Sequence, residues 1–299
     1  MFRLVIALVC VTTAPARADD RVADTRRLLD LLTGVRIAYS EAFEEGEEEL
    51  VAPDDLEEAR LVLAEARSLN DRLRLIPADT LAGVARQLES PIGGTEVPAT
   101  LDALAADVTK RTGIARDRRP LAPPSAARGR ELFGPNCAGC HGPHGTGDGP
   151  DAKRAGLVPA DFTNMVFMRR ETPADFFDRI TLGHRRRGMP EWSALTPQQR
   201  WDLIAYVWTL GQSDADRREA ARLWTSRCAG CHGATGQGVP GAAADLTQSA
   251  SSMERTDRAL FVVLSRGPHA AAVEGLTDAQ RWRLVGHART LALGGGPPR

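Results

Sequence analysis

Cys137-Ala138-Gly139-Cys140-His141 decides how this chain is interpreted, and the same five residues return as Cys228-Ala229-Gly230-Cys231-His232. A Cys-x-x-Cys-His run can hold haem through two thioether bonds, while the imidazole that follows takes an axial position on the iron. The repeated pattern therefore predicts two covalently bound haem c groups. The candidate attachment residues are Cys137, Cys140, Cys228 and Cys231, and the candidate axial ligands are His141 and His232.

Other uses of paired cysteines explain these runs less well. The gap from Cys140 to Cys228 is far wider than the spacing found in zinc ribbons. A thioredoxin-like redox pair needs a βαβ setting, and no strand-helix-strand pattern surrounds either run. Structural disulfides would leave the histidine after each second cysteine unexplained. Haem attachment uses every residue of the pattern, so we prefer it.

Composition limits the function classes. A chain of 299 residues can form two or three small domains. A formal net charge of -1 gives no reason to expect a nucleic-acid partner or an anionic membrane surface. Aromatic residues make up only 5% of the chain, and bound haem would supply apolar bulk that they do not. Any partner is therefore expected to recognise a local patch.

The start of the chain has the features of an export signal. Met1-Phe2-Arg3 is followed by the apolar stretch Leu4–Val9, and Ala16-Arg17-Ala18 offers a cleavage site of small residues. These features predict a signal peptide over residues 1–18 and a periplasmic location. No later stretch approaches the roughly 18 apolar residues of a membrane helix, so no integral membrane segment is expected in the mature chain.

Residues 19–112 are predicted to form a helical bundle. Leucines and alanines recur at helical spacing, for example Leu28, Leu29 and Leu32 and again Leu56 and Leu63. Residues 113–125 are rich in arginine and proline and are predicted to be a linker. The fold expected for the whole chain is all-α, an N-terminal helical bundle followed by two haem domains.

The bundle region also carries the acidic run from Glu41 to Glu49, which is either a solvated helix face or a set of hard oxygen ligands for a cation. Together with the stretch from Leu28 to Tyr39 and with Leu56-Glu57-Glu58-Ala59, it resembles the helical region that precedes cytochrome segments in some bacterial iron permeases. That resemblance implies an iron permease as one candidate partner. The membrane helices of such a permease are absent from this sequence.

Residues 126–212 resemble a class I cytochrome c domain. Gly129 and Phe133 are spaced one helical turn apart before the haem motif, and Pro159-Ala160-Asp161-Phe162-Thr163 matches the segment that passes over the haem in this family. A closing helix is expected from Pro197 to Leu210. The resemblance implies that Met189, in Gly188-Met189-Pro190, is the sixth ligand of the first haem iron.

Residues 213–295 form an internal repeat of the same design. Ala220 and Trp224 stand where Gly129 and Phe133 stood, but the position that matches Met189 is Ala270, which cannot bind iron. Three alternatives remain for the sixth position of the second iron. His269 could supply an imidazole, Met253 could supply a thioether, or the position could be open.

Three functions follow from these features. The leading one is one-electron transfer as an exported di-haem class I cytochrome c, with a soluble or membrane-bound redox partner and with Arg185-Arg186-Arg187 as either a docking patch or a solvated loop. A second is iron uptake, with the chain as an iron-binding accessory protein of a transporter. A third is a haem oxidoreductase whose substrate binds an open iron in the second domain. The sequence favours an electron-transfer protein over an enzyme.

Overall fold

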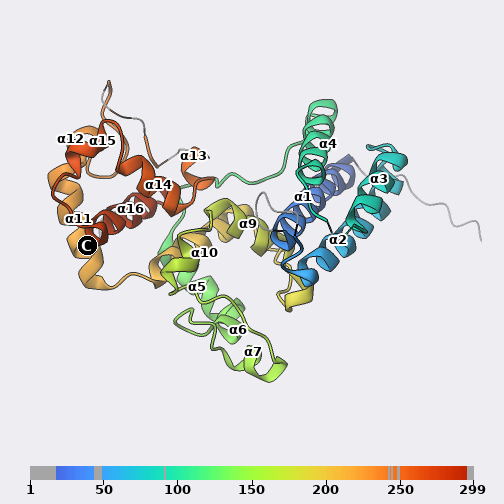
Figure 1. The fold of residues 1–299 in the computed structure, drawn as a ribbon, viewed down its shortest axis with the longest axis horizontal. Helices are drawn as coiled ribbons and strands as arrows, with labels where there is room; N and C mark the ends of the chain where they lie inside the picture. Colours follow the sequence, from blue (N-terminus) through green and yellow to red (C-terminus); the bar gives the residue numbers. More distant parts are fainter. Residues whose placement is uncertain are drawn as a thin grey trace, which may run out of the picture. The chain divides into compact units, whose positions relative to one another are not determined.

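The structure is a computed structural model that describes residues 18–43, 49–90, 92–241, 243, 245–247 and 250–294. Helices are the only regular secondary-structure elements in these ranges (Figure 1). Two isolated β-bridges accompany them, Phe43 with Leu50 and His184 with Met189. The all-α prediction is confirmed. Residues 1–17 of the predicted signal peptide and four glutamates of the acidic run, Glu44, Glu45, Glu47 and Glu48, lie outside the described residues.

The described residues group into two compact units. The first joins the residues up to Val51 with Ala59–Arg116, and the second joins Ala52–Glu58 with the residues from Asp117 onward. The boundary at Arg116 falls within the predicted linker. No helix in the described part of the chain has the length and apolar character needed to cross a membrane.

The N-terminal helical bundle is built from four elements in the order predicted. They are α1 (Ala18–Ala42), α2 (Pro53–Leu73), α3 (Ala78–Leu88) and α4 (Glu96–Thr112). The periodic leucines are buried, with Leu28 and Leu32 fully inaccessible and Leu101 of α4 1% exposed. A hydrogen-bonded ion pair of 2.7 Å between Arg27 and Glu65 joins α1 to α2. Apolar burial is the main source of stability in such a bundle.

The first cytochrome c domain starts with α5 (Ala126–Asn136) and closes with α10 (Pro197–Leu210), and these two helices pack against each other (Figure 1). A methyl group on Gly129 would lie 1.8 Å from the carbonyl oxygen of Asp202, so only glycine permits this approach. Between these helices lie α6 (Ala138–His141), α7 (Pro150–Ala155), α8 (Met165–Met168), α9 (Pro173–Leu182) and η1 (Arg185–Arg187).

The second cytochrome c domain repeats this plan with α11 (Asp214–Arg227) packed against α16 (Asp278–Ala292). The last helices of the two domains, α10 and α16, begin with the same kind of N-terminal cap. Thr196 with Gln199, and Thr277 with Gln280, each form a capping box in which side chain and backbone exchange hydrogen bonds. The remaining elements are α12 (Ala229–His232), α13 (Ala250–Met253), α14 (Asp257–Leu264) and α15 (His269–Ala272).

The two cytochrome domains share contacts inside the second compact unit. The guanidinium of Arg169 lies 3.9 Å from the ring centroid of Trp282, and the Arg169 carbonyl accepts a 3.0 Å hydrogen bond from the Arg258 backbone. Leu293, after the last helix, is buried in the apolar core of the first domain. These contacts hold the two haem domains together beyond their covalent connection.

Candidate haem sites

The first candidate site is built on the turn that follows α5. The Cys137 backbone donates to Phe133 (2.9 Å), which ends α5, and the backbones of Cys140 and His141 both donate to the Cys137 carbonyl, at 3.2 and 2.9 Å. This turn brings the two cysteines and the histidine together. Phe133 is 2% exposed and packs against Phe162, so the aromatic residue predicted behind the haem motif is in the core.

The ring of His141 is oriented by a backbone carbonyl. Its Nδ1 lies 3.2 Å from the Ala160 oxygen, within the segment predicted to pass over the haem. An imidazole that donates from Nδ1 presents its Nε2 lone pair to a metal, which is the usual arrangement for a ligating histidine. Burial lowers the pKa of His141 more strongly than the bond to Ala160 raises it, which favours the neutral form that binds iron.

Cys137 and Cys228 lack the electrostatic setting of a redox-active thiol. No disulfide joins Cys137, Cys140, Cys228 and Cys231 in the described part of the chain. Burial raises the pKa of Cys137 to about 12 and that of Cys228 to about 11. A reactive thiol pair depends on a lowered pKa, so these values argue against a thioredoxin-like site.

Met189 lies in a tight loop between η1 and α10. It is half-buried, and its backbone exchanges two hydrogen bonds with His184, at 2.8 and 2.9 Å. Gly183, just before this loop, has φ 70, and a methyl group there would lie 2.6 Å from the Met189 carbonyl oxygen. The loop that carries the predicted sixth ligand is therefore closely packed at its base.

The backbone turn of the second candidate site repeats that of the first. The Cys228 backbone donates to Trp224 (2.8 Å) and the His232 backbone donates to Cys228 (2.9 Å). The Gly238 backbone donates to the His232 carbonyl (2.9 Å), matching the 2.9 Å bond from Gly147 to His141. The internal repeat found in the sequence is thus a repeat of local structure.

One repeated feature was not predicted from the sequence. Asp161 accepts hydrogen bonds from the backbone and hydroxyl of Thr163, at 2.8 and 2.6 Å, and Asp245 accepts the same pair from Thr247, at 2.7 and 2.6 Å. The Asp-x-Thr spacing common to both domains is the signal that could have located this turn in the second one.

His269 lies beside the predicted axial ligand of the second site. The rings of His232 and His269 have centroids 5.9 Å apart and planes 12° from parallel. Met253 lies elsewhere, because it packs against the apolar core of the first domain. Of the two side chains predicted as alternatives, the structure brings only His269 to the His232 ring.

The aromatic setting of the second site also follows the repeat. Trp224 lies 5.7 Å from the His232 ring and 5.3 Å from the His287 ring. In the first domain, Phe133 lies at the same 5.3 Å from Tyr206, the counterpart of His287. Burial lowers the pKa of His287, so this side chain behaves as a neutral core aromatic.

Comparison with known families agrees with this geometry. Residues 126–211 match the cytochrome c family, and residues 215–287 match the family described as cytochrome c oxidase, cbb3-type, subunit III. The chain carries two cytochrome c domains. A di-haem c-type cytochrome of this kind binds two haem c groups covalently and takes part in electron transfer, and the thiols and imidazoles of both sites fit that cofactor.

Individual relatives extend the likeness over part of the chain. The cbb3-type cytochrome c oxidase subunit CcoP of Azospirillum sp. (strain B510) is 33% identical over 135 residues. The match covers 40% of this chain and 43% of the relative, so the chain spans less than half of that protein. Neither family nor this relative is an iron permease, and the permease resemblance of the N-terminal helices stays a prediction.

A solved structure also shares some similarity. A chain of the Kuenenia stuttgartiensis reducing HAO-like protein complex is 19% identical to this chain, and the match covers 58% of this chain and 99% of that one. Its TM-score is 0.28, which is too low to indicate a shared fold.

Proposed function

We propose that this di-haem cytochrome is a one-electron relay whose two irons have different ligand sets. Cys137 and Cys140 would attach the first haem, with His141 and Met189 as its axial ligands. Cys228 and Cys231 would attach the second, with His232 and His269. When bound, the haem groups supply reversible one-electron oxidation and reduction, and the protein sets ligation, burial and docking.

The observation that carries the proposal is the pairing of His232 with His269. Two imidazoles that share one metal atom, at ~2 Å from each nitrogen, have ring centroids roughly 6 Å apart. The observed 5.9 Å matches that separation. This spacing supports the proposal that His269, which starts α15, replaces the ligand lost at Ala270.

The two ligand sets are expected to separate the reduction potentials. Methionine opposite histidine raises the potential of a haem iron relative to two histidines. The first domain is therefore the stronger electron acceptor of the two. The shared contacts around Arg169 and Trp282 keep both domains in one compact unit, which suits exchange between them.

We further propose that the chain is exported to the periplasm and that its redox partner belongs to a membrane-bound oxidase complex. Covalent haem attachment and the predicted signal peptide support the location. The match of residues 215–287 to an oxidase subunit family, and the likeness to a CcoP protein, support the partner.

A potentiometric titration of the full-length protein tests the relay. We expect two resolved one-electron steps, each with its own change in the visible haem bands. A single step that accounts for both haems would contradict the two ligand sets. Mixing the reduced protein with a purified cbb3-type oxidase tests the partner, and failure of the oxidase to accelerate its reoxidation would exclude that assignment.

A further inference from the structure

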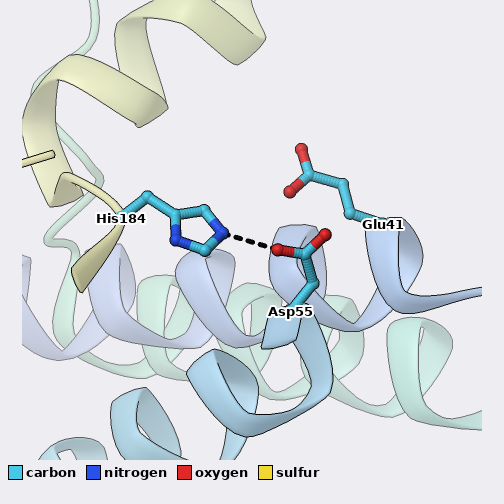
Figure 2. A group of neighbouring side chains, drawn as sticks. All are labelled: Glu41, Asp55 and His184. Atoms are coloured by element: carbon cyan, nitrogen blue, oxygen red, sulfur yellow. Dashed lines mark hydrogen bonds and ion pairs between the residues drawn. The ribbon is translucent and has the colours of Figure 1, made fainter. Parts of the chain in front are cut away.

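A buried carboxylate on α2 is hydrogen-bonded to the loop that carries Met189. Asp55 is fully inaccessible to solvent and accepts a 2.7 Å hydrogen bond from Nε2 of His184 (Figure 2). It also accepts two hydrogen bonds from the Arg187 guanidinium, at 3.1 and 2.5 Å. Asp55 belongs to Ala52–Glu58, which falls in the same compact unit as the cytochrome domains.

The side chain of His184 is fixed at both nitrogens. Its Nδ1 accepts a 3.2 Å hydrogen bond from the backbone nitrogen of Arg187, the last residue of η1, so His184 caps the start of this short helix. Nε2 must therefore carry the ring proton and donate it to Asp55. Since His184 is 3% exposed, water does not compete for this bond. The ring links the buried carboxylate to the backbone of η1.

A second carboxylate holds the same segment. Glu58, one turn further along α2, accepts hydrogen bonds from the backbone nitrogens of Arg185 (3.2 Å) and Arg186 (3.1 Å). It is 4% exposed. These backbone donors lie at the start of a helix, where they have no partner within the helix itself. Glu58 therefore stabilises the conformation of η1.

These contacts reach Met189 through a single residue, His184. His184, which Asp55 holds through its side chain, is the residue that exchanges both backbone hydrogen bonds with Met189. Gly188 closes the loop with φ 74, and a methyl group there would lie 2.6 Å from the Leu157 side chain. The Met189 backbone is therefore fixed through His184, and His184 is fixed by α2.

The same contacts change the interpretation of the three arginines before Met189. Arg186 pairs with Asp54 at 3.1 Å and Arg187 with Asp55, so carboxylates of the chain itself offset much of their charge. Burial alone would raise the pKa of Asp55, but hydrogen bonds from His184 and Arg187 lower it. His184 and Arg187 of this loop thus stabilise the buried Asp55 carboxylate in its charged form, and no external partner is needed to do so.

We propose that Asp55, Glu58 and His184 are positioning residues for Met189, and that they set how firmly this methionine is held as the sixth ligand of the first haem. The inference rests on the proposed ligation by Met189. Because these hydrogen bonds fix both ends of the loop, the Met189 thioether needs no further ordering to bind iron. An added ligand must therefore compete with a thioether that is already in place. Loosening this set would weaken the methionine bond and lower the potential of that haem.

The test compares Asp55→Asn with Asp54→Asn in the full-length haem-loaded protein. Asp54 lies beside Asp55 on the same turn, but its side chain is 71% exposed and it pairs only with Arg186 among the contacts above. Imidazole is titrated into the ferric protein while the far-red methionine–iron band is followed. Asp55→Asn weakens hydrogen bonds to a charged group, so imidazole should displace methionine roughly tenfold more readily than in wild type. In Asp54→Asn the increase should be less than about threefold.

A second readout does not depend on haem. Hydrogen exchange of the Arg185 and Arg186 amides should accelerate in Glu58→Gln, because both amides donate to the Glu58 carboxylate. If Asp55→Asn does not fold, the imidazole titration is made on Glu58→Gln, for which the same displacement is expected. In the double variant Asp55→Asn with His184→Ala, the effect on imidazole binding should be smaller than the sum of the two single effects, because both changes remove the same hydrogen bond.

Two negative results are distinguishable. Wild-type protein without the methionine–iron band would remove the Met189 ligation on which the inference rests, and would overturn both. A wild-type protein that shows the band, together with an Asp55→Asn variant that binds imidazole as weakly as wild type, would overturn the positioning role alone.

Discussion

The imidazole rings of His232 and His269 lie with centroids 5.9 Å apart and planes 12° from parallel. His232 is the last residue of the second haem motif and of α12, whereas His269 starts α15 after Gly267 and Pro268. Gly267 has φ 58, a left-handed conformation that glycine adopts without strain and that turns the chain into α15. The pair is the structural reason to assign the two haems different ligands.

Replacing His269 should open the second iron. In His269→Ala the imidazole opposite His232 is lost, and we expect the reduced protein to bind carbon monoxide at one haem per chain. Wild-type protein should bind none, because both irons would have six ligands under the proposed ligation. Met253→Leu is the control, since Met253 packs against the first domain. Carbon monoxide binding caused by Met253→Leu instead would assign the sixth ligand to that methionine.

Exchanging the ligand types should move the two potentials in opposite directions. Met189→His gives the first haem two imidazoles and should lower its potential, whereas His269→Met should raise that of the second. Each shift is expected to be on the order of 0.1–0.3 V, within the roughly 0.8 V that axial ligands span. Spectroelectrochemical titration of each variant measures this. A Met189→His protein with both potentials unchanged would exclude Met189 as a ligand.

The close approach of α5 to α10 at Gly129 should contribute to the free energy of unfolding. Gly129→Ala would place a methyl group 1.8 Å from the Asp202 oxygen, so the helices must separate, and we expect a loss of about 1–3 kcal/mol. Gly134→Ala is the matched control on the same helix, because a methyl group there meets nothing within 4 Å. Helix propensity predicts that it is neutral or stabilising by up to about 1 kcal/mol. Urea unfolding followed by circular dichroism compares them, and equal stabilities would refute the close contact.

Stability should depend on pH through Glu171. Burial, with a smaller contribution from Asp175, raises the pKa of this carboxyl from 4.5 to about 7. The folded protein therefore holds a proton that the unfolded chain releases, and its free energy of unfolding falls as pH rises from 4.5 to about 7. Glu171→Gln should remove this slope, matching wild type near pH 4.5 and exceeding it above pH 7. Urea midpoints across this range measure it, and parallel curves would exclude the effect.

The buried pair of Arg289 and Asp257 should be essential to the second domain. Arg289 is fully buried and donates to Asp257 (2.8 Å) and to the Arg255 carbonyl. Arg289→Met leaves that carboxylate buried without its cation, which predicts a loss of about 3–5 kcal/mol. Arg154→Met removes an exposed ion pair and should change stability by about 0.5 kcal/mol or less. Similar losses for the two variants in urea unfolding would contradict this account.

Features with a local cause were predictable from the sequence. The helices of the bundle follow from apolar periodicity, and the haem motifs follow from five adjacent residues. The fold class and the two haem c groups follow from the same local patterns. The turns of Asp161 with Thr163 and of Asp245 with Thr247 are local too, and the Asp-x-Thr spacing was the signal that could have located them.

Features that depend on distant contacts were not predictable. Asp55 and His184 are 129 residues apart, so nothing local links the acidic start of α2 to the loop of Met189. The places of His269 and Met253 likewise depend on how α15 and α13 pack, which sets the His269 ring 5.9 Å from that of His232 and packs Met253 against the core of the first domain. The ion pairs of Arg186 with Asp54 and of Arg187 with Asp55 also lay beyond prediction, because 132 residues separate the partners of each pair.

Near-infrared magnetic circular dichroism of the oxidised, full-length protein tests the central claim most directly, because the charge-transfer band of low-spin ferric haem reports the axial ligand pair. The account predicts two bands of equal haem content, one for histidine with methionine and one for two histidines. A spectrum with a histidine–methionine band and a high-spin, five-coordinate second haem would contradict the pairing of His232 with His269.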